Sequence, residues 1–145
     1  MLLAILNKFL TDLDEVVNIA ETKISGPGDR FRIMLRAHFE VVASKPMRAK
    51  IFLQEEHNLP DDARDILSKH RKAYQARFVE AFAEGVAAGK FMPYKPELAV
   101  SLLIGAGNWV HRWFNLEGPL SAAELAEFAD AMLFGGYRMA KRRLR

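Results

Sequence analysis

Hydrophobic residues return every three or four positions along nearly the whole chain, and no long stretch alternates between apolar and polar residues. A repeat of about 3.6 residues is that of an α-helix, whereas alternation is that of a strand. The pattern therefore predicts an all-α fold, a bundle of six helices. We expect these helices over residues 2–23, 29–44, 46–57, 60–88, 96–114 and 122–145.

Proline, glycine and capping residues separate these helices. The loop at residues 25–28 reads Ser-Gly-Pro-Gly, and Pro46 breaks the chain again because its ring clashes inside a continuing helix. Residues 60–62, Pro-Asp-Asp, place a proline and two carboxylates in a first turn, where both are favoured. Gly89 stands where a C-terminal cap belongs, and residues 121–124, Ser-Ala-Ala-Glu, have the capping-box pattern.

The fifth predicted helix is apolar on nearly every side, so one neighbouring helix cannot cover it. The sixth adds an apolar stripe that includes Leu125, Phe128 and Met132, with small residues that permit close helix approach. Two helices from each of two subunits, meeting around a two-fold axis, would cover both. This predicts a homodimer whose interface residues are Leu102, Trp109, Trp113, Phe128, Met132 and Gly136. The alternative is that the fifth helix is the central helix of a monomeric bundle.

Polar side chains occur on apolar stripes of the second and fourth predicted helices, which points to a binding pocket between helices. The stripe of the second helix contains His38, and that of the fourth begins at Ile66 and includes a histidine, three aromatic residues and an arginine. Met47 and several phenylalanines either line the cavity or fill a core. The candidate ligand-binding residues are His38, Phe39, His70, Tyr74, Arg77, Phe78 and Asn108. Each histidine could instead be a hydrogen-bonded core residue, and Arg77 could extend its charged end to solvent.

Composition bounds the function further. The 145 residues are half hydrophobic, enough for one domain with a core, and contain no cysteine. Subtracting the five cations of the C-terminal segment, residues 138–145, from the net charge of +3 leaves −2 over residues 1–137. This segment would complement a helix dipole, or else act as a DNA-contacting arm. No apolar run is long enough to span a membrane, so we expect a soluble, cytoplasmic protein.

Motifs for catalysis and metal binding are missing from the sequence. The four histidines show no short spacing that would hold a metal on one helix face. Residues 55–57, Glu-Glu-His, point in different directions on a helix and cannot converge on one substrate atom. No serine-hydrolase elbow and no glycine-rich phosphate loop is present. We therefore expect neither an enzyme nor a bound metal or cofactor.

Three local patterns resemble the C-terminal region of TetR-type transcriptional regulators, and the resemblance covers the whole chain. Residues 2–6, Leu-Leu-Ala-Ile-Leu, look like the start of the long helix that follows the DNA-binding head. Residues 84–91 look like the end of the central helix of that family. The most specific pattern is similar to the link between the dimerising helices and contains Gly107-Asn108-Trp109, Trp113-Phe114, Gly118-Pro119-Leu120-Ser121 and Glu124-Leu125-Ala126.

The resemblance implies one effector-binding and dimerisation domain over residues 1–145, with pocket helices in residues 1–94 and dimerisation helices in residues 95–145. It implies a small hydrophobic effector, a fatty acid or acyl-CoA-like molecule, that favours one position of the first helix. DNA would be bound only through an N-terminal head that we expect to be missing from this chain. The alternative is a helical protein-interaction module. A cavity of a few hundred cubic ångströms between the first four helices would favour the effector, and a solid core the alternative.

Overall fold

The computed structural model describes residues 1–24 and 26–135, and this part of the chain contains helices and no strand. The all-α prediction is confirmed. Helix α2 has the expected bounds, α1, α4 and α5 differ from expectation by one or two residues at their ends, and the third predicted helix is divided into α3 and the 3-10 helix η1. The elements are α1 (Leu2–Glu21), α2 (Asp29–Ser44), α3 (Pro46–Glu55), η1 (Glu56–Asn58), α4 (Asp61–Ala87), α5 (Pro96–Trp113) and α6 (Ala122–Phe134). The predicted extension of the sixth helix beyond residue 135 lies outside the described residues.

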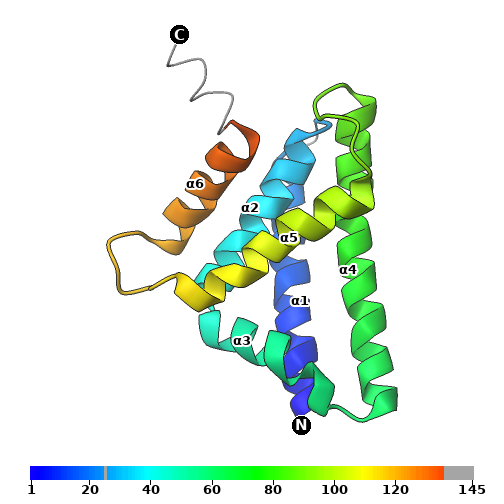
Figure 1. Cartoon of the computed structure of the whole chain (residues 1–145), viewed down its shortest axis with the longest axis vertical. Helices are drawn as coiled ribbons and strands as arrows, with labels where there is room; N and C mark the ends of the chain where they lie inside the picture. Colours follow the sequence, from blue (N-terminus) through cyan, green and yellow to red (C-terminus); the bar gives the residue numbers. More distant parts are fainter. Residues whose placement is uncertain (25, 136–145) are drawn as a thin grey trace.

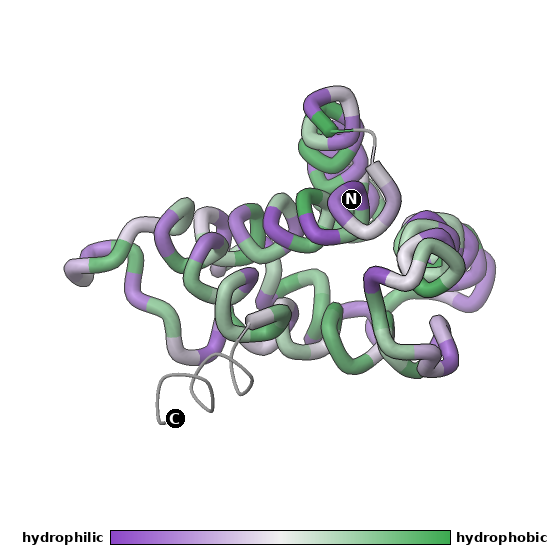
Figure 2. The backbone as a smooth tube through the Cα atoms, turned by 90° about the horizontal axis from the view of Figure 1, so that it is seen from above, coloured by the Kyte–Doolittle hydropathy of each residue, from purple (hydrophilic) through white to green (hydrophobic). Residues whose placement is uncertain are grey.

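Helix α2 is the centre of the fold and packs against all five other α-helices. In Figure 1, α1 and α4 run lengthwise, α5 crosses in front of α2, and α6 lies on the side of α2 away from α4. Figure 2 shows hydrophobic and hydrophilic residues alternating around the helices, the amphipathic pattern of a bundle. The central position of α2 agrees with its sequence, because most of its side chains are apolar and nine of its sixteen residues are buried.

An aromatic cluster closes the end of the bundle where α2 begins and α4 and α6 end. The fully buried ring of Phe31 meets the rings of Phe82 and Phe91 edge to face, with centroids 5.2 and 5.8 Å apart. Phe91 also stacks on Phe82 at 5.0 Å and contacts Phe134 at 5.6 Å. The cluster therefore connects α2, α4, the loop after α4 and α6.

Gly85 makes this cluster possible, since a β-carbon there would lie 2.4 Å from the Phe91 ring. We expect Gly85→Ala to lower the free energy of unfolding by about 1–3 kcal/mol, because Phe91 is held by other rings and cannot move away freely. Urea denaturation measures this. The matched control is Gly105→Ala, where nothing lies within 4 Å of the added carbon and an ordinary helix-favouring gain of up to about 1 kcal/mol is expected. Equal effects at both positions would contradict the close-packing role.

Three details of the predicted packing are wrong. Ile66 is 53% exposed, while its neighbour Leu67 is fully buried, so the inward face of α4 is rotated by one residue near its start. Met47 is 67% exposed and lines no interior surface. On α6, Leu125 faces inward with Ala126 and Ala129, whereas Phe128 and Met132, placed on the same stripe, face outward. In each case the periodicity identified a helix correctly but the packing partners selected a different face.

Candidate functional site

Three polar side chains from different helices form a hydrogen-bonded trio that begins in the core. The Tyr74 hydroxyl of α4 donates to Nδ1 of His38 on α2 at 2.7 Å. Nε2 of His38 donates to Oδ1 of Asn108 on α5 at 2.9 Å. His38 and Tyr74 are 2% and 3% exposed and Asn108 is half-buried, so this polar group extends from the core toward the surface where α2, α4 and α5 meet. We refer to Tyr74, His38 and Asn108 as the polar trio.

The surroundings of the polar trio are apolar and tightly packed. The Phe78 ring lies 5.1 Å from the Tyr74 ring and 6.1 Å from the His38 ring, centroid to centroid. Helix α5 approaches α2 closely because Gly107 has no side chain: a β-carbon there would be 2.9 Å from Cδ2 of His38 and 3.2 Å from the Phe39 ring. The fold therefore brings five of the seven candidate residues into one cluster, which consists of the polar trio, Phe39 and Phe78.

Burial fixes the protonation states of this cluster. It lowers the pKa of His38 to about 4, although the hydrogen bond with Asn108 acts in the opposite direction. Burial also raises the pKa of Tyr74 well above its ordinary value. At neutral pH the imidazole is therefore uncharged. Its single proton is on Nε2, because Asn108 presents an oxygen there and Tyr74 donates to Nδ1.

The other two candidates, His70 and Arg77, lie against α1 and do not join the polar trio. His70 is placed between Oδ1 of Asn7 and Oδ2 of Asp14, each 2.7 Å from one ring nitrogen. The Arg77 guanidinium donates to Asp14 at 3.3 Å and to two further oxygens at 2.7 Å, those of Asn18 and Glu21. These contacts form a polar seam between α1 and α4.

The sequence reasoning missed the α1 side of this polar seam. Its members at positions 7, 14, 18 and 21 are separated by seven, four and three residues, which places them on one face of a helix. That spacing, beside the opposite charge of Arg77, was the available signal.

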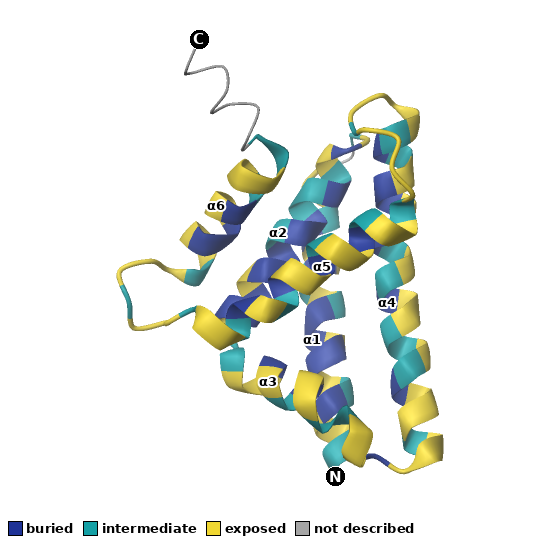
Figure 3. Cartoon of the chain, viewed as in Figure 1, coloured by how far each residue is buried: buried dark blue, intermediate teal, exposed yellow. Residues whose placement is uncertain are grey.

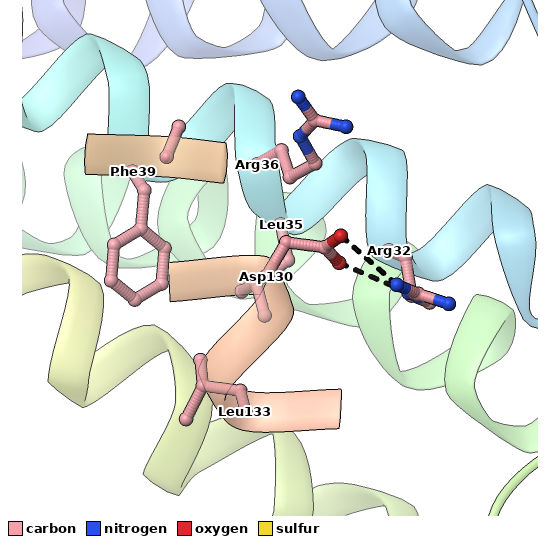
Figure 4. A pocket seen from close by; sticks show the side chains of 7 residues that line it. Arg32, Leu35, Arg36, Phe39, Asp130 and Leu133 are labelled. Atoms are coloured by element: carbon pink, nitrogen blue, oxygen red, sulfur yellow. Dashed lines mark hydrogen bonds and ion pairs between the residues drawn. The ribbon is translucent and has the colours of Figure 1, made fainter. Parts of the chain in front are cut away.

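A pocket among the described residues lies elsewhere, between α2 and α6, and is a shallow depression of about 150 Å³, open solvent included, that is too small to enclose a water molecule. Figure 4 shows Arg32 paired with Asp130 on one side of it and the apolar side chains of Leu35, Phe39 and Leu133 around it. Five of the side chains expected to line an interior cavity instead form the polar trio and its packed surroundings. The interior between α2, α4 and α5 is thus packed in this structure.

The outward face of α5 is apolar and exposed, in contrast to its buried inward face at Val100, Ile104, Gly107 and Val110. Figure 3 shows exposed residues along this helix and along α6. Arg112 covers part of the Trp109 ring, with Cζ 4.8 Å from the ring centre. The exposed fractions of the predicted interface residues are 68% for Leu102, 58% for Trp109, 59% for Trp113, 58% for Phe128 and 55% for Met132. Gly136, the sixth predicted interface residue, lies outside the described residues.

The part of the chain that the structure describes contains neither a candidate metal site nor a candidate membrane-spanning helix. Within it, no three histidine, aspartate or glutamate side chains are grouped so that they could hold a metal ion. No described helix is long and apolar enough to cross a membrane.

The comparisons with known proteins identify the family of this all-helical domain. Residues 25–137 match the family of tetracyclin repressor-like C-terminal domains, and the chain belongs to this family. The predictions of a TetR-type regulator and of a chain that is not an enzyme are confirmed by this match.

Relatives of known character support the assignment. The chain is 30% identical over 117 residues to the HTH-type transcriptional repressor KstR2 of Mycolicibacterium smegmatis, a match that covers 77% of this chain and 56% of that protein. The chain thus spans little more than half the length of this relative.

Solved structures show the same fold. A TetR/AcrR-family regulator from Thermobifida fusca has a TM-score of 0.81 and 28% identity, over 94% of this chain and 73% of its own. AibR, solved with isovaleryl coenzyme A and operator DNA, has a TM-score of 0.81 and 26% identity, over 92% of this chain and 72% of its own.

Proposed function

We propose that this domain senses a small, largely apolar effector of the fatty acid or acyl-CoA class and dimerises through α5 and α6, as the regulatory half of a TetR-type transcriptional repressor. The observation that carries the proposal is the polar trio. A core of the same shape filled with apolar side chains is as stable as one that contains a satisfied polar network, so stability does not account for the trio. A few convergent polar groups in an apolar interior are what a ligand site requires.

A ligand-bound relative supports the class of effector. AibR, which shares the fold over most of this chain, was solved with isovaleryl coenzyme A. The aromatic and aliphatic side chains around the polar trio suit the acyl part of such a ligand, because burying each methylene group contributes about 0.8 kcal/mol.

The packed interior means that the effector binds by displacing side chains. The polar seam between α1 and α4 is the place where opening the bundle costs the least free energy. When it opens, its polar groups lose their hydrogen bonds with one another but form hydrogen bonds with water in their place. The apolar side of α1, with Leu6, Leu10 and Leu13, is buried and separate from this seam. Opening the seam would let α4 move relative to α1, and an effector that prefers the open arrangement would shift the population toward it. DNA binding and repression would then respond through the first helix, as the family resemblance implies.

Acyl-CoA binding should raise the thermal stability of the purified chain. A thioester present at about 100 times its dissociation constant adds roughly 2.7 kcal/mol, which corresponds to a shift in Tm of roughly 6–10 °C for a domain of this size. Differential scanning fluorimetry with acyl-CoA thioesters of four to sixteen carbons measures it, with coenzyme A alone as the control. The proposal fails if no thioester exceeds that control and native mass spectrometry finds no co-purified small molecule.

A second candidate is a helical protein-interaction module without a small-molecule site. The packed interior around the polar trio favours it, as does the exposed apolar face of α5. In that case the acyl-CoA series leaves Tm unchanged, while self-association or binding of a protein partner through α5 and α6 is retained.

A further inference from the structure

The polar trio has hydrogen-bonding capacity that the fold does not use. Asn108 employs its oxygen to bind His38, and its Nδ2 donates to no residue that the structure describes. The Tyr74 oxygen donates its only proton to His38 and keeps its lone pairs for a further donor. A ligand group at this position therefore meets amide N–H donors from Asn108 and an acceptor oxygen from Tyr74.

No buried cation is available to this position. Among the described residues, His38, Tyr74 and Asp12 are the buried side chains with polar or charged groups, and His38 is neutral. Asp12 is a carboxylate bound by three surface cations, Lys8, Lys45 and Arg48, where α1 meets α3. It offers nothing to an anion beside the trio.

The arginine that follows Tyr74 on α4 is already engaged. Arg77 is one helical turn from Tyr74, but its guanidinium binds two carboxylates, Asp14 and Glu21, in the polar seam. The electrostatic potential at the Tyr74 hydroxyl is not positive. Burial is the main cause of the raised pKa of this hydroxyl, the Asp14 carboxylate is the second, and Arg77 offsets the effect of Asp14 only in part. A carboxylate pushed into this interior would be desolvated without a cationic partner, which is strongly unfavourable.

We propose that the end of the effector that enters the core is an uncharged hydrogen-bonding group, the carbonyl of a thioester, ester, amide or ketone or a hydroxyl, and that Asn108 and Tyr74 select it over a carboxylate. This inference rests on the proposed effector-binding function and narrows it. A thioester carbonyl accepts a hydrogen bond from Asn108 and carries no charge, whereas a free fatty acid is ionised at neutral pH. The polar trio thus favours an acyl-CoA-like effector over a free fatty acid, a choice that the sequence analysis left open.

Isosteric ligand pairs test the proposal directly. Octanamide and octanoate differ in charge but hardly in shape, and the comparison is extended to the same pairs with five, twelve and sixteen carbons. Isothermal titration of the full chain at pH 7.5 is expected to show the amide binding at least about 100-fold more tightly than the acid. Octanoyl-CoA and coenzyme A alone are titrated beside them.

Two variants assign the selectivity to residues. Asn108→Leu and Tyr74→Phe are expected to lower octanamide affinity about tenfold each and to reduce the difference between amide and acid. The matched control is Tyr94→Phe, the same chemical change at a tyrosine that is 60% exposed in the loop before α5. The wild-type comparison does not depend on whether the variants fold.

The outcomes separate this inference from the function on which it rests. Acids that bind as tightly as amides, or variants at positions 74 and 108 that keep the full wild-type discrimination, overturn the inference and leave effector binding intact. If no acid, amide or thioester of any length binds, the proposed function fails and the inference fails with it.

Discussion

The double variant Trp109→Ala, Trp113→Ala is expected to weaken self-association by at least about 100-fold. Both indoles lie on the outward face of α5, more than half exposed in the single chain. Large aromatic side chains at the centre of an interface contribute about 2 kcal/mol or more each, and 1.4 kcal/mol corresponds to a factor of ten. Sedimentation velocity across nanomolar to micromolar concentrations measures the change.

The controls separate loss of association from loss of folding. Helix content by circular dichroism should be nearly unchanged, because neither indole fills the core. Met47→Ala with Ile66→Ala removes comparably exposed apolar side chains from α3 and α4 and should leave the dimer intact. A wild-type chain that stays monomeric at micromolar concentration, or a double variant that dimerises like wild type, would refute the interface on α5 and α6.

The helix boundaries could be predicted because the signals that set them are local. Pro46 is the first residue of α3, as its fixed backbone angle favours. Ser121 accepts a hydrogen bond from the backbone of Glu124, whose side chain accepts one in return from the Ser121 backbone, the reciprocal capping box that the four-residue pattern indicated. Gly89, directly after the C-cap of α4, has φ of +73°, a conformation that favours glycine. None of these requires knowledge of a distant residue.

The candidate site was less predictable because a helix stripe is about 100° wide and can face several neighbours. Tyr74 and Arg77 share the α4 stripe, yet one faces α2 and the other faces α1. Asn108 reaches His38 only because Gly107 beside it lets α5 come close, a contact between residues 70 positions apart. Periodicity selects a face, and tertiary packing then divides that face among partners.

His38 should make the domain sensitive to mild acid. Its folded pKa of about 4 lies below the ordinary value of 6.5, so between these values the unfolded chain binds a proton that the folded chain excludes. The free energy of unfolding is therefore unaffected by protonation of His38 above pH 6.5, and it decreases as the pH falls from 6.5 toward 4 because the unfolded chain is protonated first. We expect about 2 kcal/mol to be lost by pH 5 and about 3 kcal/mol in full.

Urea denaturation at pH 7.5 and pH 5 measures this loss before most carboxylates begin to titrate. His38→Gln retains a polar side chain of similar size but has no proton to gain, so its stability should change by about 2 kcal/mol less than wild type over the same interval. His57→Gln is the matched control, because His57 is exposed at the end of the α3 region and should keep the wild-type response. If His38→Gln and wild type lose equal stability between these two pH values, the imidazole is not held neutral in the core. The conclusion that the polar trio is uncharged, on which the proposed ligand selection depends, would then be wrong.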